Sequence, residues 1–303
     1  MVDLVGKDAV LSDYAQKLAA PRGRSLTDDA LRRLFANPAA LGSLIVLLAV
    51  IAVAVIGPFF LHWTYDKIDW GAIKKPPDFA KQHYFGTDQN GRDMLARTLQ
   101  GTQVSLLVGF VATAVSVVIG VVYGAIAGYF GGRIDAAMMR FVDVMYALPY
   151  ILFVIILMVV FGRNFVLLFV GIGAIEWLTM ARIVRGQTLS LKEREFVEAA
   201  RAGGARPLTI IMRHIVPNLT GPVVIYATLT VPEIIITESF LSYLGLGVQE
   251  PLTSLGTLIS DGAPVAEVMP WLLVAPAAIL IAILLCLTFL GDGLRDALDP
   301  RDH

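Results

Sequence analysis

The chain has 303 residues, of which 56% are hydrophobic and only 16% are charged. A soluble domain averages about 45–50% apolar and about 25% charged residues, so this composition indicates a membrane protein. The net charge of −1 gives no basic excess and predicts no nucleic-acid partner. The single cysteine, Cys286, excludes an internal disulfide and a metal site built from cysteines.

Long apolar stretches recur along the chain. A hydrocarbon core about 30 Å thick needs about 20 apolar residues per helical span. We predict six membrane-spanning helices, at 41–61, 104–130, 144–161, 165–180, 219–246 and 270–290. Pro149 predicts a kink in the third span, and the fourth is short and carries Glu176. The predicted organisation is an N-terminal segment 1–40, a first span 41–61, an external loop 62–103 with a short helix, a core 104–292 and a tail 293–303.

Lysine and arginine are distributed unevenly between the two sides of these spans. They are concentrated in the N-terminal segment and in the connection between the fourth and fifth spans, whereas the last external loop, 247–269, has none. Basic residues favour the cytoplasmic side of a membrane. The sequence therefore predicts both termini in the cytoplasm and a multi-pass protein of the cell membrane.

The connection at 186–217 carries the strongest local pattern. Gly203 and Gly204 predict a helix stop, because glycine tolerates the left-handed conformation that ends helices. Pro207 suits the first turn of a second helix, which Pro217 is expected to end. The second helix has an apolar stripe that can lie on the membrane surface, formed by Leu208, Ile211, Met212 and Ile215. We predict a helix–turn–helix against the cytoplasmic face, although an ordinary amphipathic connector would share these patterns.

Within this connection, Glu198-Ala199-Ala200, then Gly204, then His214-Ile215-Val216-Pro217 resembles the EAA loop of ABC-importer permease subunits. Isoleucine is commoner in the family at the position of His214. In that family the loop is a coupling helix that sits in a groove of the ATPase subunit. The resemblance implies ATPase-coupling roles for Glu198, Ala199, Ala200, Gly204, Arg213 and Pro217. It also implies that ATP and magnesium bind to partner subunits, and we expect no cofactor and no metal in this chain.

Other segments resemble the C-type permease subunits of peptide importers, oligopeptide permeases in particular. They are 69–70, 83–85, 85–93, 181–192, 240–247 and 291–300. The resemblance implies an all-α protein with the type I ABC importer permease fold and six transmembrane helices in the bacterial inner membrane. It implies a second, homologous permease subunit, two ATPase subunits or domains and an extracytoplasmic peptide-binding protein as partners. Dipeptides, glutathione and metal chelates stay open as alternative substrates.

The external segment before the second span combines a turn with charged residues. Asn90-Gly91 is a strong tight-turn dipeptide, and Thr87 or Asp88 could cap a short helix at 92–100. Asp88, Arg92 and Asp93 are candidate contacts for the binding protein. The second span also has small residues at a four-residue period, which favour close packing of helices within the chain: Ala112, Ser116, Gly120, Gly124 and Gly128.

Three acidic residues fall within predicted spans. Burying a charge there costs roughly 2.5–3.5 kcal/mol, so such residues usually face protein or water. Glu176, Glu233 and Glu238 are candidates for a translocation path, with a structural hydrogen bond as the alternative for each.

Signatures of catalysis are absent from the sequence. It has no Gly-x-x-x-x-Gly-Lys-Ser/Thr phosphate loop, no His-Glu-x-x-His and no Gly-x-Ser-x-Gly. We therefore expect a non-catalytic subunit that receives its energy from another polypeptide. A secondary transporter, the other class of transporter, would be expected to show internal repeats, and none is seen.

Overall fold

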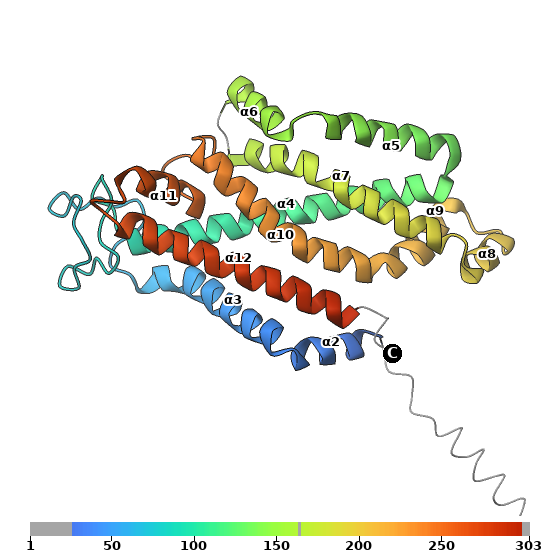
Figure 1. Ribbon diagram of the computed structural model, residues 1–303, viewed down its shortest axis with the longest axis horizontal. Helices are drawn as coiled ribbons and strands as arrows, with labels where there is room; N and C mark the ends of the chain where they lie inside the picture. The colour runs from blue at the N-terminus through green and yellow to red at the C-terminus, as the bar shows by residue number, and fades with distance from the viewer. Residues whose placement is uncertain (1–25, 163–164, 299–303) are drawn as a thin grey trace, which may run out of the picture.

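The computed structural model describes residues 26–162 and 165–298, and it is an elongated bundle of helices (Figure 1). The helices are α2 (Leu26–Ala36), α3 (Pro38–Ile56), α4 (Met94–Phe130), α5 (Gly132–Ala147), α6 (Tyr150–Phe161), α7 (Phe165–Leu191), α8 (Glu195–Ala202), α9 (Pro207–Ile210), α10 (Thr220–Tyr243), α11 (Leu255–Gly262) and α12 (Trp271–Leu298). The segment between α9 and α10 stays helical, as a π-turn (Ile211–Ile215) and a 3₁₀ turn (Val216–Leu219).

Side-chain caps fix the starts of α3 and α4. Asn37 accepts hydrogen bonds from the backbone amides of Ala39 and Ala40, at 3.0 and 3.3 Å, and Pro38 occupies the first turn of α3. Asp93 caps α4 by accepting the amide of Ala96 at 2.8 Å. These bonds satisfy backbone donors that a helix start otherwise leaves unpaired.

Within the described residues, four helices are long and apolar enough to cross a membrane: Pro38–Phe60, Met94–Phe130, Pro207–Tyr243 and Trp271–Leu298. Helices α5 and α6 would together make a fifth span, but they are bent by 78° at the break between them. The count of six therefore stays a prediction. The predicted fourth span lies within α7, which extends to Leu191, well past the predicted end at Met180.

The second span begins ten residues earlier than expected. A separate short helix at 92–100 was predicted, capped by Thr87 or Asp88; instead one continuous helix, α4, starts after its cap Asp93. The polar residues of its first turns are compatible with a helix because they bond back to it. Thr98 donates to the carbonyl of Met94 at 2.6 Å, and Thr102 donates to that of Thr98 at 2.8 Å.

The third span is broken where only a kink was predicted. Helix α5 ends at Ala147, Leu148 and Pro149 adopt extended backbone angles, and α6 begins at Tyr150. Proline disfavours the helical conformation in the residue before it, which explains why the break falls at Leu148. Helix α6 packs inward through Val154 and Met158, whereas Leu152 and Ile156 stay exposed.

The small-residue row of α4 packs against α7, as predicted for packing within the chain. A Cβ added at Gly120 would lie 2.5 Å from Cβ of Met180, and one at Gly128 would lie 2.7 Å from Cβ of Thr188. At Gly124 an added Cβ would clash with the carbonyl of Ala181. The helices thus approach so closely that only glycine fits, and this face of α4 is already covered by the same chain.

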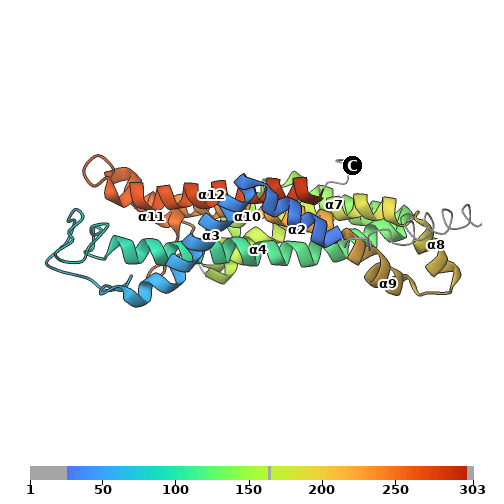
Figure 2. The same ribbon diagram turned by 90° about the horizontal axis from the view of Figure 1, so that it is seen from below.

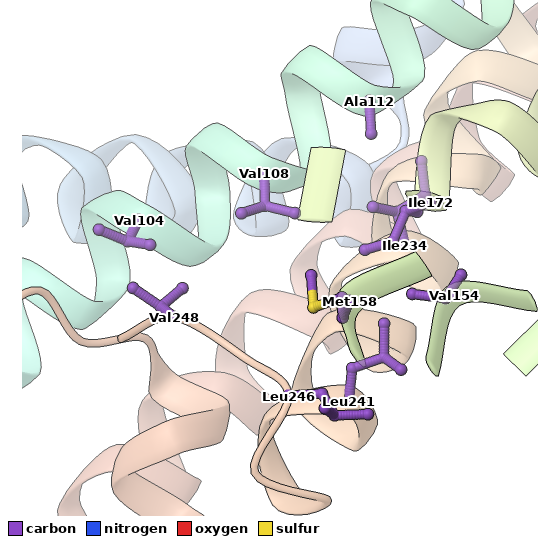
Figure 3. Packing of buried hydrophobic residues seen from close by; sticks show 10 residues of the cluster. All are labelled: Val104, Val108, Ala112, Val154, Met158, Ile172, Ile234, Leu241, Leu246 and Val248. Atoms are coloured by element: carbon purple, nitrogen blue, oxygen red, sulfur yellow. The ribbon is translucent and has the colours of Figure 1, made fainter. Parts of the chain in front are cut away.

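A buried apolar cluster holds the middle of the bundle together (Figure 3). Its ten residues come from α4, α6, α7, α10 and the segment after α10: Val104, Val108, Ala112, Val154, Met158, Ile172, Ile234, Leu241, Leu246 and Val248. The cluster joins α6 to the longer helices α4, α7 and α10. By contrast, α3 exposes large apolar side chains such as Ile45, Leu48 and Val53, as a helix facing lipid does.

The two ends of the bundle differ in kind (Figures 1 and 2). One end, called the loop end, consists of residues 61–93 together with α11. The other end, called the α8 end, carries α8 and α9, and the C-terminus of α4 and the N-terminus of α5 lie close to it. The candidate functional residues divide between the loop end, the α8 end and the helices that connect them.

Candidate functional site

At the α8 end, the predicted helix–turn–helix is present. Helix α8 ends at Ala202, Gly203 is its C-cap, and Gly204 has a φ of +78°. Pro207 then occupies the first turn of α9. The left-handed angle at Gly204 turns the chain back toward the bundle, which confirms the predicted helix stop.

Helix α8 presents a small, charged outer surface on an apolar base. Glu198 and Ala199 are exposed, Ala200 is half-buried, and Val197 is fully buried. The cluster around Val197 includes Val184 of α7 and the buried isoleucines Ile210, Ile211 and Ile215. Short side chains on an exposed helix allow another backbone to approach closely, and the buried base holds that helix in place.

The second helix of this connection departs from the sequence prediction in two ways. Ile211 and Ile215 are buried inside the connection, whereas Leu208 and Met212 are 65% and 54% exposed, so the four residues do not form one surface stripe. The cause is the π-turn at Ile211–Ile215, which shifts the helical register by one residue. Pro217 also does not end the helix, because it lies in the first turn of a 3₁₀ segment that leads directly into α10. Arg213 and Pro217 are both exposed.

Polar contacts tie α8 to the end of α4. The ammonium group of Lys192 donates to the carbonyl of Gly128 at 3.1 Å. The guanidinium of Arg201 lies over the ring of Tyr129, 5.8 Å from its centre. These contacts make α8 an extension of the α4–α7 pair.

Among the acidic residues of the spans, Glu238 is fully buried. Ser242 donates to its Oε1 at 2.7 Å, and Ser105 of α4 donates to its Oε2 at 3.4 Å. The hydroxyl of Ser242 lies 3.3 Å from that of Ser254, the N-cap of α11. Glu238 thus joins α4, α10 and the start of α11 inside the chain, which is the structural alternative raised for it from the sequence.

Glu233 and Glu176 have a different environment. Glu233 is exposed on α10, and Glu176 is half-buried on α7. The two carboxyl groups are close enough to repel each other. The structure therefore places Glu176 and Glu233 within electrostatic range of each other, whereas Glu238 is bonded to Ser105 and Ser242.

At the loop end, Asp88 is the centre of a buried ion cluster. Its Oδ1 accepts the backbone amides of Asn90 and Arg92, both at 2.8 Å, and its Oδ2 pairs with Arg92 Nε at 2.8 Å and with Arg97. Arg92 also reaches Glu250 at 2.8 Å. Burial raises the pKa of Asp88, but the Arg92 amide and the two guanidinium charges outweigh it, so that the pKa lies below the usual value.

A second cluster surrounds His83, which is 1% exposed. Its Nδ1 lies 2.9 Å from Asp93 Oδ2 and its Nε2 lies 3.4 Å from Asp69 Oδ2, and its ring stacks on Trp63. Burial raises the pKa of Asp93, against hydrogen bonds from Ala96 and His83. Both clusters fold residues 61–93 onto the start of α4.

Three of these residues are the binding-protein contacts that the sequence predicts. Asp88, Arg92 and Asp93 are 6%, 8% and 2% exposed, so within the chain they act as internal ties. Sequence reasoning missed their partners Arg97 and Glu250. Arg97 is only nine residues from Asp88 but lies outside the motif at 85–93. Glu250 lies 158 residues from Arg92, and no local pattern connects them.

A cavity of about 360 Å³ opens beside the Asp88 cluster. Its polar lining includes Asp88, Arg92, Arg97, Glu250 and Asp261, and its apolar lining includes Met94, Leu258 and Leu272. Exposed Gln89 and Asn90 lie at the same place. This face can bind a polar partner, because its lining combines buried charges with the exposed polar groups of Gln89, Asn90 and Glu250.

Comparison with known proteins places the chain in a family. Residues 120–301 match the family described as binding-protein-dependent transport system inner membrane component, and residues 25–77 match the N-terminal TM domain of oligopeptide transport permease C. The oligopeptide transport system permease protein OppC of Escherichia coli (strain K12) is 52% identical over 97% of each chain. OppC of Haemophilus influenzae (strain ATCC 51907 / DSM 11121 / KW20 / Rd) is 53% identical over 93% of this chain and 90% of that protein. The dipeptide transport system permease protein DppC of Bacillus subtilis (strain 168) is 44% identical over 91% of this chain and 86% of that protein.

The fold agrees with this. The structure is similar to the MetNI methionine ABC transporter in inward-facing conformations, with a TM-score of 0.54 and 20% identity over 68% of this chain and 96% of that chain. A second crystal form of that transporter gives a TM-score of 0.53 and 22% identity over 68% of this chain and 98% of that chain. The chain therefore belongs to the family of binding-protein-dependent transport system inner membrane components, as an ABC-transporter permease subunit of the oligopeptide permease C group.

Proposed function

We propose that this chain is the transmembrane permease subunit of an ATP-driven importer that moves oligopeptides from an extracytoplasmic binding protein into the cytoplasm. The oligopeptide substrate is inferred from the names of relatives at 52% and 53% identity. The partners are a second, homologous permease subunit, two ATPase subunits or domains and the binding protein. ATP and magnesium bind to the ATPases.

The observation that carries the proposal is the form of α8. It is an exposed helix with small side chains at Ala199 and Ala200, held on a buried base and tied to α4 through Lys192. A surface of this kind can seat in a groove of another protein and pass on its movement. Coupling residues in this proposal are Glu198, Ala199, Ala200, Gly204, Arg213 and Pro217.

Basic residues at the α8 end support the proposed orientation. The α8 end carries the basic residues Arg194, Arg201, Arg206 and Arg213, and we assign it to the cytoplasm together with both termini. The loop end then faces the binding protein. Its exposed residues Gln89, Asn90 and Glu250 are placed for direct contact, whereas Asp88, Arg92 and Asp93 act through the shape that they give the loop.

The translocation path in this proposal passes the face that holds Glu233 and Glu176. Such carboxylates offer a polar surface to the backbone and the amino group of a peptide. Glu238, which is buried behind this face, supports the helices around it.

The test is transport by the whole complex. The chain, its partner permease, the ATPases and the binding protein are reconstituted in liposomes, and ATP-dependent uptake is measured for radiolabelled trialanine, dialanine, glutathione and a nickel chelate. Preference for trialanine supports the proposal. Uptake of only one of the other solutes would show that this solute, and not an oligopeptide, is the substrate. Uptake by this chain without ATPases would overturn the mechanism.

The alternative substrate with a specific observation behind it is a dipeptide, because the relative named DppC is 44% identical to this chain. The dialanine arm of the same experiment decides between the two. Orientation is tested separately with cysteines at Lys81 and Glu193, both exposed, in a Cys286→Ser background. An impermeant thiol reagent is expected to label position 81, and not 193, in intact cells.

A further inference from the structure

Helix α5 is attached to the bundle in an unusual way. At its start, Gly131 and Gly132 have φ angles of +63° and +54°, and at its end Leu148 and Pro149 are extended. Helix α5 is thus bounded by a non-helical link on each side. Its outer side chains Ile134 and Phe141 are 48% and 51% exposed. A helix between two such links is positioned by the contacts along its length.

Two ion pairs join α5 to α7 along that length. Asp135 accepts Arg185 Nε at Oδ1, 2.5 Å away, and Arg185 Nη2 at Oδ2, 2.6 Å away. Asp143 accepts Arg182 Nη2 at 2.8 Å through a single bond. Asp135 is 8% exposed, whereas the side chains of Asp143 and Arg182 are 56% and 43% exposed. Paired, partly buried hydrogen bonds fix geometry far better than one exposed contact.

Arg185 lies where the backbone of α7 comes very close to α4. Its backbone faces Gly124 and Gly128 of α4, where no side chain fits. Seven residues later, Lys192 binds the carbonyl of Gly128, and α8 follows directly. The α7 segment between Arg185 and α8 is thus in close contact with α4, so it offers a direct route from α8 to Arg185.

We propose that Asp135 is a positioning residue for coupling: through its paired bonds to Arg185 it makes α5 follow α7, so that movement of α8 bends the α5–α6 span at Leu148–Pro149. Helix α6 is the part of this span that reaches the core, since Val154 and Met158 lie in the buried apolar cluster (Figure 3). The inference rests on the proposed function, because it needs an ATPase acting on α8.

The test compares Asp135→Asn with the matched variant Asp143→Asn in the reconstituted complex, and ATP hydrolysis and trialanine uptake are measured together. Arg185 is about one-third exposed, so loss of its partner leaves no fully buried charge and the complex is expected to assemble. We expect Asp135→Asn to keep ATP hydrolysis but to lower uptake per ATP by about tenfold, within the range of coupling between contacting residues. Asp143→Asn is expected to retain the wild-type ratio.

A charge exchange distinguishes positioning from general damage. The double variant Asp135→Arg with Arg185→Asp is expected to recover uptake per ATP. Arg185→Lys keeps the charge but cannot form the paired hydrogen bonds, so its uptake per ATP is expected to lie between those of Asp135→Asn and the wild type. Equal ratios for Asp135→Asn and the wild type would overturn the inference. Failure of the proposed function is recognised separately, because the wild-type complex itself would then show no ATP-dependent uptake.

Discussion

The hydroxyl of Ser105 on α4 donates to the buried carboxyl group of Glu238 on α10 over 3.4 Å, and it also accepts the backbone amide of Leu255 at 3.1 Å. One side chain thus joins two long helices to the first residue of α11. These hydrogen bonds give the acidic residue of an apolar helix a structural role.

The first prediction concerns Glu238. Glu238→Ala removes the acceptor for Ser242 and Ser105 and leaves a cavity, so the free energy of unfolding is expected to fall by about 2–4 kcal/mol. Glu238→Gln keeps an acceptor oxygen and is expected to lose less than half of that. Thermal melting of the purified complex measures both. The control is Glu233→Ala, exposed on the same helix, which is expected to melt close to the wild type.

A second prediction separates transport from stability at Glu233 and Glu176. Glu233→Gln and Glu176→Gln are expected to leave ATPase attachment and melting unchanged while altering peptide uptake several-fold, because these carboxylates share one face in the proposed path. Uptake of a peptide with a lysine side chain should change more than uptake of trialanine. Unchanged uptake of both peptides in the double variant would remove this face from the path.

The third prediction addresses the coupling surface. Gly204→Val places a β-branched residue at a φ of +78°, a strain of roughly 1–2 kcal/mol, and is expected to misplace α8 and lower the amount of ATPase bound. Ala199→Trp adds bulk at an exposed position without straining the chain, so it is expected to block the ATPase by size alone.

Ala200→Trp is a less specific test, because Ala200 also packs against the buried base of α8. The measurement is the ATPase retained on the complex after purification. Normal ATPase binding and normal uptake in both Gly204→Val and Ala199→Trp would show that this segment is an ordinary connector.

The fourth prediction tests the close packing of α4 on α7. Gly124→Val would force a side chain against the carbonyl of Ala181, and overpacking of this kind costs about 1–3 kcal/mol or more. Gly186→Ala is the control, because nothing lies within 4 Å of its added Cβ. We expect a lower melting temperature for the first variant and an unchanged or slightly higher one for the second.

A fifth prediction follows from the ion cluster at the loop end. Asp88→Asn removes the charge that pairs with two largely buried arginines, and the expected loss of stability is about 3 kcal/mol at neutral pH. Asp66→Asn, at an exposed loop position, is expected to have little effect.

The pH dependence of that loss has a definite sign. The pKa of Asp88 in the folded protein is below the usual value of about 4, so its contribution is present above pH 4 and disappears as the pH falls through the folded pKa. The melting temperatures of the wild type and Asp88→Asn should therefore differ at pH 7 and converge in acid. A constant difference across this range would assign the effect to shape instead of charge.

Much of this protein was determined by local sequence. Apolar length predicted the stretches that form α3, α4, α10 and α12, because a bilayer core requires about 20 apolar residues per span. Gly204 and Pro207 marked the turn after α8, since backbone conformation alone restricts these positions. Glycines at a four-residue period on α4 identified the face that packs closely, although the sequence did not show that α7 covers it.

Only the tertiary structure decided how residues far apart in the chain meet. Proline at 149 was compatible with a kink or a break, and the packing of Val154 and Met158 into the core selects the bent arrangement. Glu233 and Glu238 look alike in sequence, yet one is exposed and the other is buried among hydroxyl groups supplied by α4 and α10. Local sequence determines the backbone conformation that a segment prefers and whether the segment is apolar overall. The environment of a single charged group depends instead on the side chains that other helices bring next to it.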